Sequence, residues 1–296
     1  MELLDTFPAF ERYWARVRDL PVRTQVERWE SDYMSPWPEL LEMQKDDYRR
    51  AGASWRRVAR TRIFPHLPER LERLRRLHAN LRRELPRAWS RTRKALGVDF
   101  EVQFVIYVGL GCGAGWATRL GGRPAVLFGL ENAAEMTAGR RGEWPAAVSH
   151  EVAHLVHEEW RRRVGLGRLE ESREPYWQLY EEGFATECER NIDDPKVFQR
   201  RTGRSGWLPW CQKHQAELAG QFLRDVRARR SVRRFFGSWY NIQGYTQSGY
   251  YLGAEAVREL KKSYSLTQIA RLQRREVRRR MRRILEGFVA AGSLQS

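Results

Sequence analysis

One short stretch with a two-residue repeat separates long stretches that carry the repeat of an α-helix. The apolar residues at its alternate positions are Val102, Phe104, Ile106 and Val108. This alternation predicts a strand, and a glycine-rich turn at 109–115 and further apolar stretches at 116–118 and 125–128 follow it. We therefore expect a small antiparallel sheet in a fold of the α+β class that is mostly α.

Helical periodicity covers most of the remaining chain. We expect helices over residues 10–62 with breaks at Pro21 and 35–38, over 68–96 with a kink or restart near Pro86, and over 144–161, 176–190, 207–230, 248–262 and 266–287. No linker, repeat or low-complexity tract marks a domain boundary. We expect an N-terminal helical region at 1–97 and a second domain at 98–296, or one compact unit of both.

The chain shows no feature of a membrane or secreted protein. It contains no run of about 18 apolar residues, and its first residues lack the basic and apolar parts of a signal peptide. The three cysteines, Cys112, Cys188 and Cys211, are widely spaced and form no CxxC pair, which argues against a disulfide framework or a cysteine-bound zinc. We therefore expect a cytoplasmic protein with no membrane partner.

Arginine dominates the charge of the chain. Lys and Arg number 54 against 37 Asp and Glu, which gives a net charge of +17, and 48 of the basic residues are arginine. One interpretation is the replacement of lysine by arginine on solvated helix faces. The other is a surface for nucleic acid or an acidic partner. Most arginines are dispersed, but the runs Arg227–Arg234 and Arg274–Arg283 would form a basic patch if they face the same way.

The segment His150-Glu151-Val152-Ala153-His154 is the most informative motif. Two histidines four residues apart on a helix project from one face and can share a metal ion, and the intervening Glu151 can act on the attacking water. The flanking residues are apolar almost all round: Ala146, Ala147, Val148, Val152, Ala153, Leu155 and Val156. Polar groups in such a helix are costly unless they are coordinated, although an accidental motif with two solvated histidines is the alternative.

A glutamate from a later helix is the candidate third ligand. Positions 157 and 160 hold His and Trp, which excludes the metzincin pattern. The segment Glu182-Gly183-Phe184-Ala185 resembles the EGFA or EGLA segment of the gluzincins, in particular their aminopeptidase branch and short zinc peptidases with the same motifs. The resemblance spans residues 100–262 and implies a zincin-like domain in which Glu182, and not Glu181, binds zinc. We also expect the small Gly183 to let this helix approach the HExxH helix.

Two weaker matches concern the substrate. Tyr250 lies three residues before Gly253, like the tyrosine that stabilises the oxyanion in the aminopeptidases, while Tyr251, Tyr245 or simple aromatic packing remain alternatives. Residues 129–132 resemble the segment that binds a free α-amine, which would give that role to Glu131. A glutamate that begins a helix and favours its dipole is the preferred interpretation. His157 either lines the cleft or is a buried, hydrogen-bonded histidine.

The resemblance implies a zinc-dependent peptidase with one Zn²⁺ per chain. His150, His154 and Glu182 would bind the metal, Glu151 would be the general base and Tyr250 the oxyanion donor. Mn²⁺, Co²⁺ and Ni²⁺ bind similar ligands. The substrate would be a peptide or protein whose backbone pairs with an edge strand at 125–128. The alternatives are a metal-binding but inactive interaction protein and an arginine-rich nucleic-acid-binding protein.

Overall fold

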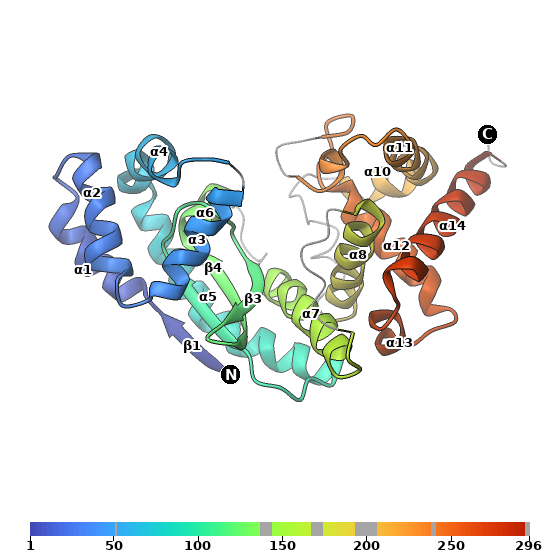
Figure 1. Ribbon diagram of the computed structural model, residues 1–296, viewed down its shortest axis with the longest axis horizontal. Coiled ribbons are helices and arrows are strands. Elements are labelled where there is room, and N and C mark those ends of the chain that lie inside the picture. Colours follow the sequence, from blue (N-terminus) through green and yellow to red (C-terminus); the bar gives the residue numbers. More distant parts are fainter. Residues whose placement is uncertain (51, 137–143, 167–173, 193–205, 238–240, 294–296) are drawn as a thin grey trace. The chain divides into compact units, whose positions relative to one another are not determined.

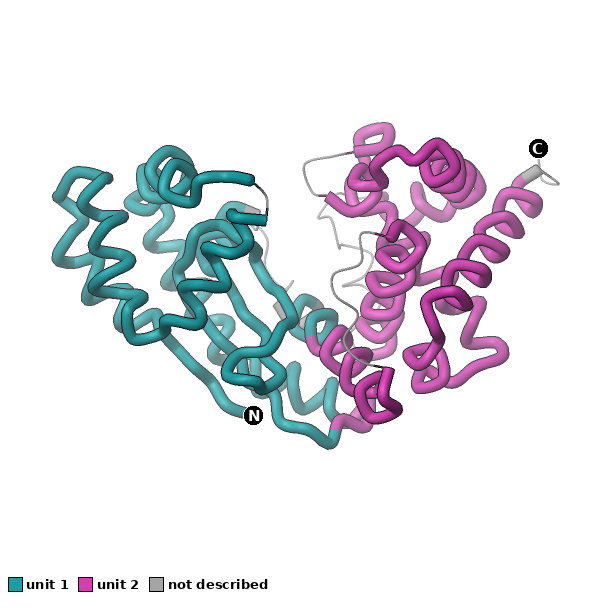
Figure 2. Tube along the Cα trace, in the orientation of Figure 1, with its two compact units in different colours: residues 1–93, 99–151 teal, residues 94–98, 152–296 magenta. Residues whose placement is uncertain are grey.

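The chain forms two compact units. A computed structural model describes residues 1–50, 52–136, 144–166, 174–192, 206–237 and 241–293 (Figure 1). Unit 1 comprises residues 1–93 and 99–151, and unit 2 comprises residues 94–98 and 152–296 (Figure 2). This division differs from the boundary expected after residue 97, because the sheet belongs to the same unit as the N-terminal helices.

A four-stranded mixed sheet forms the centre of unit 1. Its strands are β1 (Glu2–Asp5), β2 (Gln103–Tyr107), β3 (Trp116–Leu120) and β4 (Arg123–Gly129), in the order β1-β2-β4-β3. The α+β, mostly α class is confirmed, but the expected antiparallel sheet is wrong. β2 is parallel to both β1 and β4, and only β3 and β4 are antiparallel.

The strand order also corrects the expected edge strand. β4, which contains the stretch 125–128, lies between β2 and β3, so the edge on this side is β3. All five residues of β2 are buried, which is typical of an inner parallel strand. The period-two pattern therefore identified a strand whose two faces are both covered.

Aromatic side chains of a π-helical turn bind the end of β2. The helices of unit 1 are α1 (Phe7–Val17), α2 (Val22–Arg28), α3 (Pro38–Arg50), α4 (Trp55–Val58), α5 (Leu67–Leu96) and α6 (Leu130–Met136), with π-helical turns at Trp29–Met34 and Ala59–Ile63 and a 3₁₀ turn at Phe64–His66. The Trp29 indole donates to the Val108 carbonyl (3.1 Å), and the Tyr33 hydroxyl accepts from the Val108 amide (3.0 Å). These bonds hold the end of β2 where the glycine-rich turn begins.

Unit 2 is helical in its described residues. Its helices are α7 (Trp144–Arg162), which begins in unit 1, α8 (Pro175–Ile192), α10 (Trp207–Lys213), α11 (Gln215–Arg227), α12 (Ser248–Lys261), α13 (Leu266–Ala270) and α14 (Arg274–Ser293), with a 3₁₀ turn at Arg233–Phe235. The helices expected at 207–230 and 266–287 are each divided in two. Among the described residues, none of the helices has both the length and the apolar character needed to span a bilayer.

Two glycines allow α8 and α12 to touch backbone to backbone. A Cβ atom at Gly183 would overlap the carbonyl group of Gly253, and one at Gly253 would overlap the carbonyl oxygen of Leu179 and lie 2.9 Å from the Cα of Gly183. The expectation that Gly183 admits the HExxH helix is therefore corrected, because the helix that it admits is α12. This contact sets the spacing of α8 and α12 near Glu182.

Substitution of Gly253 by alanine tests this contact. Because the added methyl group would meet backbone atoms that cannot rotate away, we expect Gly253→Ala to destabilise the protein by about 1 to 3 kcal/mol or more. Gly287→Ala on α14 is the control, since nothing lies within 4 Å of its added Cβ, and it should be neutral or stabilising by up to about 1 kcal/mol. Denaturant unfolding of both variants measures the difference, and equal stabilities would contradict the close contact.

Candidate metal centre

Three side chains with metal-binding atoms converge between helices α7 and α8. His150, His154 and Glu182 each offer a ligand atom, and these atoms lie within 4.8 Å of one another. The Nε2 atom of His154 lies 3.6 Å from a carboxylate oxygen of Glu182. Two ligands that are 2.0–2.1 Å from a tetrahedral zinc are about 3.4 Å apart, so this spacing fits a shared ion. Two imidazoles and one carboxylate are also a donor set that zinc prefers.

The burial of α7 explains why these groups require a partner. Val148, Val152, Ala153 and Val156 are fully buried around the motif, as the apolar flanks predicted. His150 is 5% exposed, whereas the side chains of His154 and Glu182 are 19% and 24% exposed. The group therefore combines one buried and two partly exposed side chains.

Glu151 does not belong to the ligand group. Its side chain lies beside Gly115, the last residue before β3, and a Cβ atom at Gly115 would be 3.5 Å from the Cγ of Glu151. Glu151 is therefore adjacent in sequence to His150 but outside the group that could hold a metal ion.

The glycine-rich turn is held in place by Glu131. This fully buried carboxylate accepts hydrogen bonds from the amides of Gly109 (2.7 Å) and Gly111 (2.8 Å), and Asn132 donates to the Gly111 carbonyl (3.0 Å). Burial raises the pKa of Glu131, although the two amides partly offset this effect. Glu131 lies in the first turn of α6, as expected, and its carboxylate is engaged by the backbone, so it is not available to a substrate amine. No sequence pattern indicated these two bonds.

The three candidate tyrosines have different surroundings. Tyr251 is buried and donates its hydroxyl to Gln215 (3.1 Å), within a core cluster that includes Trp207 and Cys211. Tyr245 is stacked on Trp210 at 4.4 Å. Tyr250 is partly exposed in the first turn of α12, with its ring against Phe236. Of the three, Tyr251 has its hydroxyl engaged by another side chain.

His157 joins α7 to α8. It is 2% exposed, lies among the rings of Trp177, Tyr180 and Phe184, and its Nε2 is 3.0 Å from the Tyr180 hydroxyl. Because that hydroxyl donates its only proton to the Ile269 carbonyl, Nε2 must carry a proton and donate to it. Burial and the nearby Arg161 cation lower the pKa of His157 well below its usual value. The interpretation of His157 as a buried, hydrogen-bonded histidine is confirmed.

Arg161 continues this network one turn further along α7. Its buried guanidinium donates to the carbonyls of Ala270 (2.8 Å) and Leu272 (2.7 Å) and lies over the Trp177 ring. The carbonyls at the end of α13 thus receive donors from both α7 and α8. Sequence analysis missed the roles of Arg161 and Tyr180, because their partners lie about 90 to 110 residues away in the chain.

The two adjacent glutamates of α8 differ in surroundings. Glu182 belongs to the ligand group and Glu181 does not, which agrees with the assignment implied by the resemblance. Burial raises the pKa of Glu181, and the nearby His154 partly offsets this effect.

No protein-family model, no curated protein and no solved structure matches this chain. The interpretation of the site therefore depends on the side chains themselves.

The ligand group predicts a defined pattern of metal retention. Wild-type protein should contain about one zinc per chain. Loss of a residue that only hydrogen-bonds to a metal ligand lowers metal affinity roughly 10- to 100-fold, so Glu182→Gln, which removes a ligand, should lower zinc affinity by more than this. Glu181→Gln is the matched control and should retain the metal. Elemental mass spectrometry with a competitive chelator titration measures both quantities. Equal zinc in the Glu182→Gln and wild-type proteins would contradict the assignment.

The neutral state of His157 predicts a pH-dependent stability. Its folded-state pKa lies below the unfolded value of about 6.5, so its contribution is present above that pH and is lost as the pH falls toward the folded-state value. Between pH 7 and 5 the free energy of unfolding of the wild type should therefore fall more steeply than that of His157→Gln. The difference in slope should be up to about 1.4 kcal/mol per pH unit. Denaturant unfolding in EDTA measures this difference without metal release. Parallel pH profiles would contradict a neutral buried imidazole.

Proposed function

We propose that the protein is a zinc-dependent peptidase of the gluzincin type. The observation that carries the proposal is the group of His150, His154 and Glu182, with Glu151 adjacent to it on the same helix. Three protein ligands are the number found in catalytic zinc sites, whereas structural sites use four. A bound Zn²⁺ would supply Lewis acidity, which favours hydroxide formation from water and polarises a carbonyl group.

Glu151 is the proposed general base. It follows His150 directly on α7, is half-buried, and stands outside the ligand group, with its Cγ close to Gly115. Its carboxylate would take a proton from the attacking water and then pass it to the leaving amine. This assignment uses one carboxylate for both proton transfers of amide hydrolysis.

Tyr250 is the proposed oxyanion donor. It lies one turn before Gly253, and Glu182 directly precedes Gly183, so the glycine contact between α12 and α8 limits the separation of the two side chains. Tyr251 serves the core and Tyr245 stacks on Trp210, which leaves Tyr250 as the best candidate. A donor that is already positioned before the reaction needs little reorganisation during it.

The proposed binding strand for the substrate backbone is β3. Among the described residues this strand pairs with β4 alone, and it begins immediately after Gly115, which lies beside Glu151. An added strand receives main-chain hydrogen bonds whatever its sequence, so this mode suits peptides and extended protein segments. The engagement of Glu131 by the glycine-rich turn removes the candidate anchor for a free α-amine and favours cleavage within a chain.

The variants Glu151→Gln and Tyr250→Phe test the proposed mechanism. Glu151→Gln should retain zinc but lose about 10²- to 10⁴-fold in kcat, because the proton acceptor is removed. Tyr250→Phe should lower kcat by about 10²- to 10³-fold with little change in KM, since it acts on the transition state. A mixed library of internally quenched peptides, read by fluorescence and mass spectrometry, is the assay.

The controls separate chemistry from folding. Both variants should match the wild type in zinc content and thermal midpoint, whereas Tyr251→Phe should affect stability more than kcat because it breaks the bond to Gln215. Zinc-loaded wild type that cleaves no peptide in the library would reject the peptidase and favour the metal-binding, inactive alternative.

A further inference from the structure

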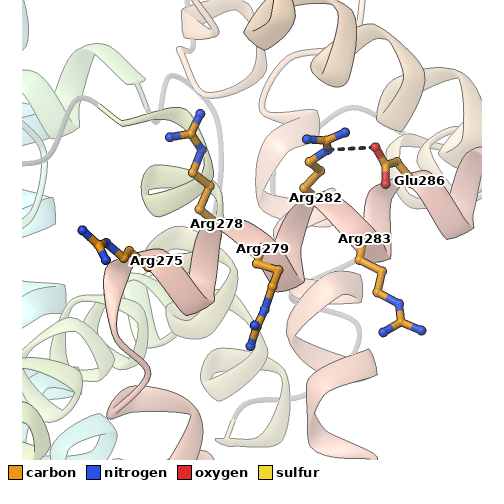
Figure 3. A pocket seen from close by; sticks show the side chains of 6 residues that line it. All are labelled: Arg275, Arg278, Arg279, Arg282, Arg283 and Glu286. Carbon is orange, nitrogen blue, oxygen red and sulfur yellow. Dashed lines mark hydrogen bonds and ion pairs between the residues drawn. The ribbon is translucent and has the colours of Figure 1, made fainter.

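Helix α14 carries arginines along one exposed side. The exposed members are Arg274, Arg275, Arg278, Arg279, Arg282 and Arg283. Positions 275, 279 and 283 form one row and positions 274, 278 and 282 form a second, with steps of four residues, or about 6 Å along the helix axis. Side chains of this segment and Glu286 line a surface hollow of about 480 Å³ (Figure 3).

The opposite side of α14 fixes this orientation. Val277, Met281 and Leu285, also four residues apart, are buried, and α14 packs mainly against α11 and α8. Rotation of the helix would expose this apolar row, so the arginine rows must face outward. The exposure of the arginines is therefore a consequence of the fold.

Five of these six exposed arginines form no ion pair within the described parts of the chain: Arg274, Arg275, Arg278, Arg279 and Arg283. Arg282 pairs with Glu286, and the less exposed Arg280 pairs with Glu276. We call the four unpaired arginines that line the hollow, Arg275, Arg278, Arg279 and Arg283, the arginine face (Figure 3). In the view of Figure 3 the side chain of Arg278 points away from those of Arg279 and Arg283, so the four guanidinium groups are spread over a broad side of α14 and give it a positive potential.

The second arginine run meets this helix at one carboxylate. Arg227 at the end of α11 pairs with Glu286 at 3.3 Å, and Arg282 pairs with the same oxygen at 2.9 Å. The two runs noted in the sequence therefore adjoin each other in unit 2. Part of the second run is neutralised, because Arg230 and Arg234 both bind the buried Asp225. Of this second run, Arg229 and Arg233 are exposed and form no ion pair among the described residues, so they add to the positive charge beside the arginine face.

We propose that the arginine face binds the phosphate backbone of double-stranded nucleic acid. Guanidinium groups match phosphate oxygens with two parallel hydrogen bonds, and a rigid helix presents several of them at regular steps to a regular array of phosphates. Residues 274–283 contain no aromatic side chain, so the face offers no stacking platform for single strands. Binding through phosphates alone is independent of sequence.

An anionic membrane fits the observations less well. A helix that binds at a membrane interface inserts its apolar side between the lipids, but the apolar side of α14 is buried against the protein. The proposal is also independent of the metal centre, because it invokes neither the zinc ligands nor Glu151. Success or failure of a peptide-cleavage assay therefore does not decide it.

Equilibrium binding of the full chain to labelled duplexes tests the proposal. Fluorescence anisotropy would use DNA and RNA duplexes of roughly 20 bp at about 50 to 200 mM KCl. Wild type should bind both with a steep salt dependence, and the combined variant R275Q/R278Q/R279Q/R283Q should bind at least about tenfold more weakly. Its slope of log affinity against log salt should fall by about 3 to 4, or about one per lost phosphate contact.

A charge-matched variant is the control. R12Q/R16Q/R57Q/R76Q removes four exposed arginines of unit 1 that form no described ion pair, and it also lowers the net charge from +17 to +13. It should bind within about threefold of the wild type, because its arginines contact no phosphate. Circular dichroism checks the fold of both variants. If the combined α14 variant does not fold, the single variants R279Q and R283Q should each lower the salt slope by about one.

Three outcomes would overturn the proposal. Equal weakening by both combined variants would show that net charge, and not the arginine face, drives binding. Unchanged binding by the α14 variant would exclude the face. Tighter binding of polyglutamate or of phosphatidylserine vesicles than of either duplex would assign the face to an acidic protein or to a membrane.

Discussion

The insertion of His157 among the rings of α8 is the interaction on which the candidate site depends. α7 carries two of the ligand side chains and α8 carries the third, so the site exists only if the two helices keep a fixed register. His157 lies one turn after His154 and donates to Tyr180, two residues before Glu182. The imidazole therefore sets this register, and its neutral state follows from the apolar surroundings that make the packing possible.

A second constraint acts from the other side of α8. The glycine pair Gly183 and Gly253 brings α12 into backbone contact with the turn that carries Glu182. The Tyr180 hydroxyl and the Arg161 guanidinium also bind carbonyls at the end of α13. α8 is thus held by the buried imidazole of His157, by the backbone contact with α12, and by the hydrogen bond from Tyr180 to α13. Such support from several elements is what a metal site needs to keep its ligands in place.

Local patterns predicted most of the helices and the ligand set. The HExxH spacing and the Glu182-Gly183 segment are local features, and α7, α8 and α12 begin and end within two residues of the expected positions. Three helix breaks were missed. They lie before Ser54, which caps α4, at His214 between α10 and α11, and at residues 271–273 between α13 and α14. All three depend on backbone geometry that apolar periodicity does not report.

Non-local contacts account for the larger errors. β1 has only four residues and pairs in parallel with β2 about 100 positions later, so no local signal identified it or the mixed character of the sheet. For the same reason β3, and not the stretch 125–128, is the edge strand. Gly183 was predicted to make a close approach, but the sequence does not reveal that its partner is Gly253.

X-ray absorption at the zinc edge tests the central claim most directly, because it reports the atoms bound to the ion. The account predicts two imidazole nitrogens and oxygen ligands at about 2.0 to 2.2 Å in a four-coordinate site, without sulfur. Glu182→Gln should change this spectrum, and Glu151→Gln should leave the protein ligands unchanged. Sulfur at about 2.3 Å, or a Glu182→Gln spectrum identical to that of the wild type, would contradict the proposed ligand set.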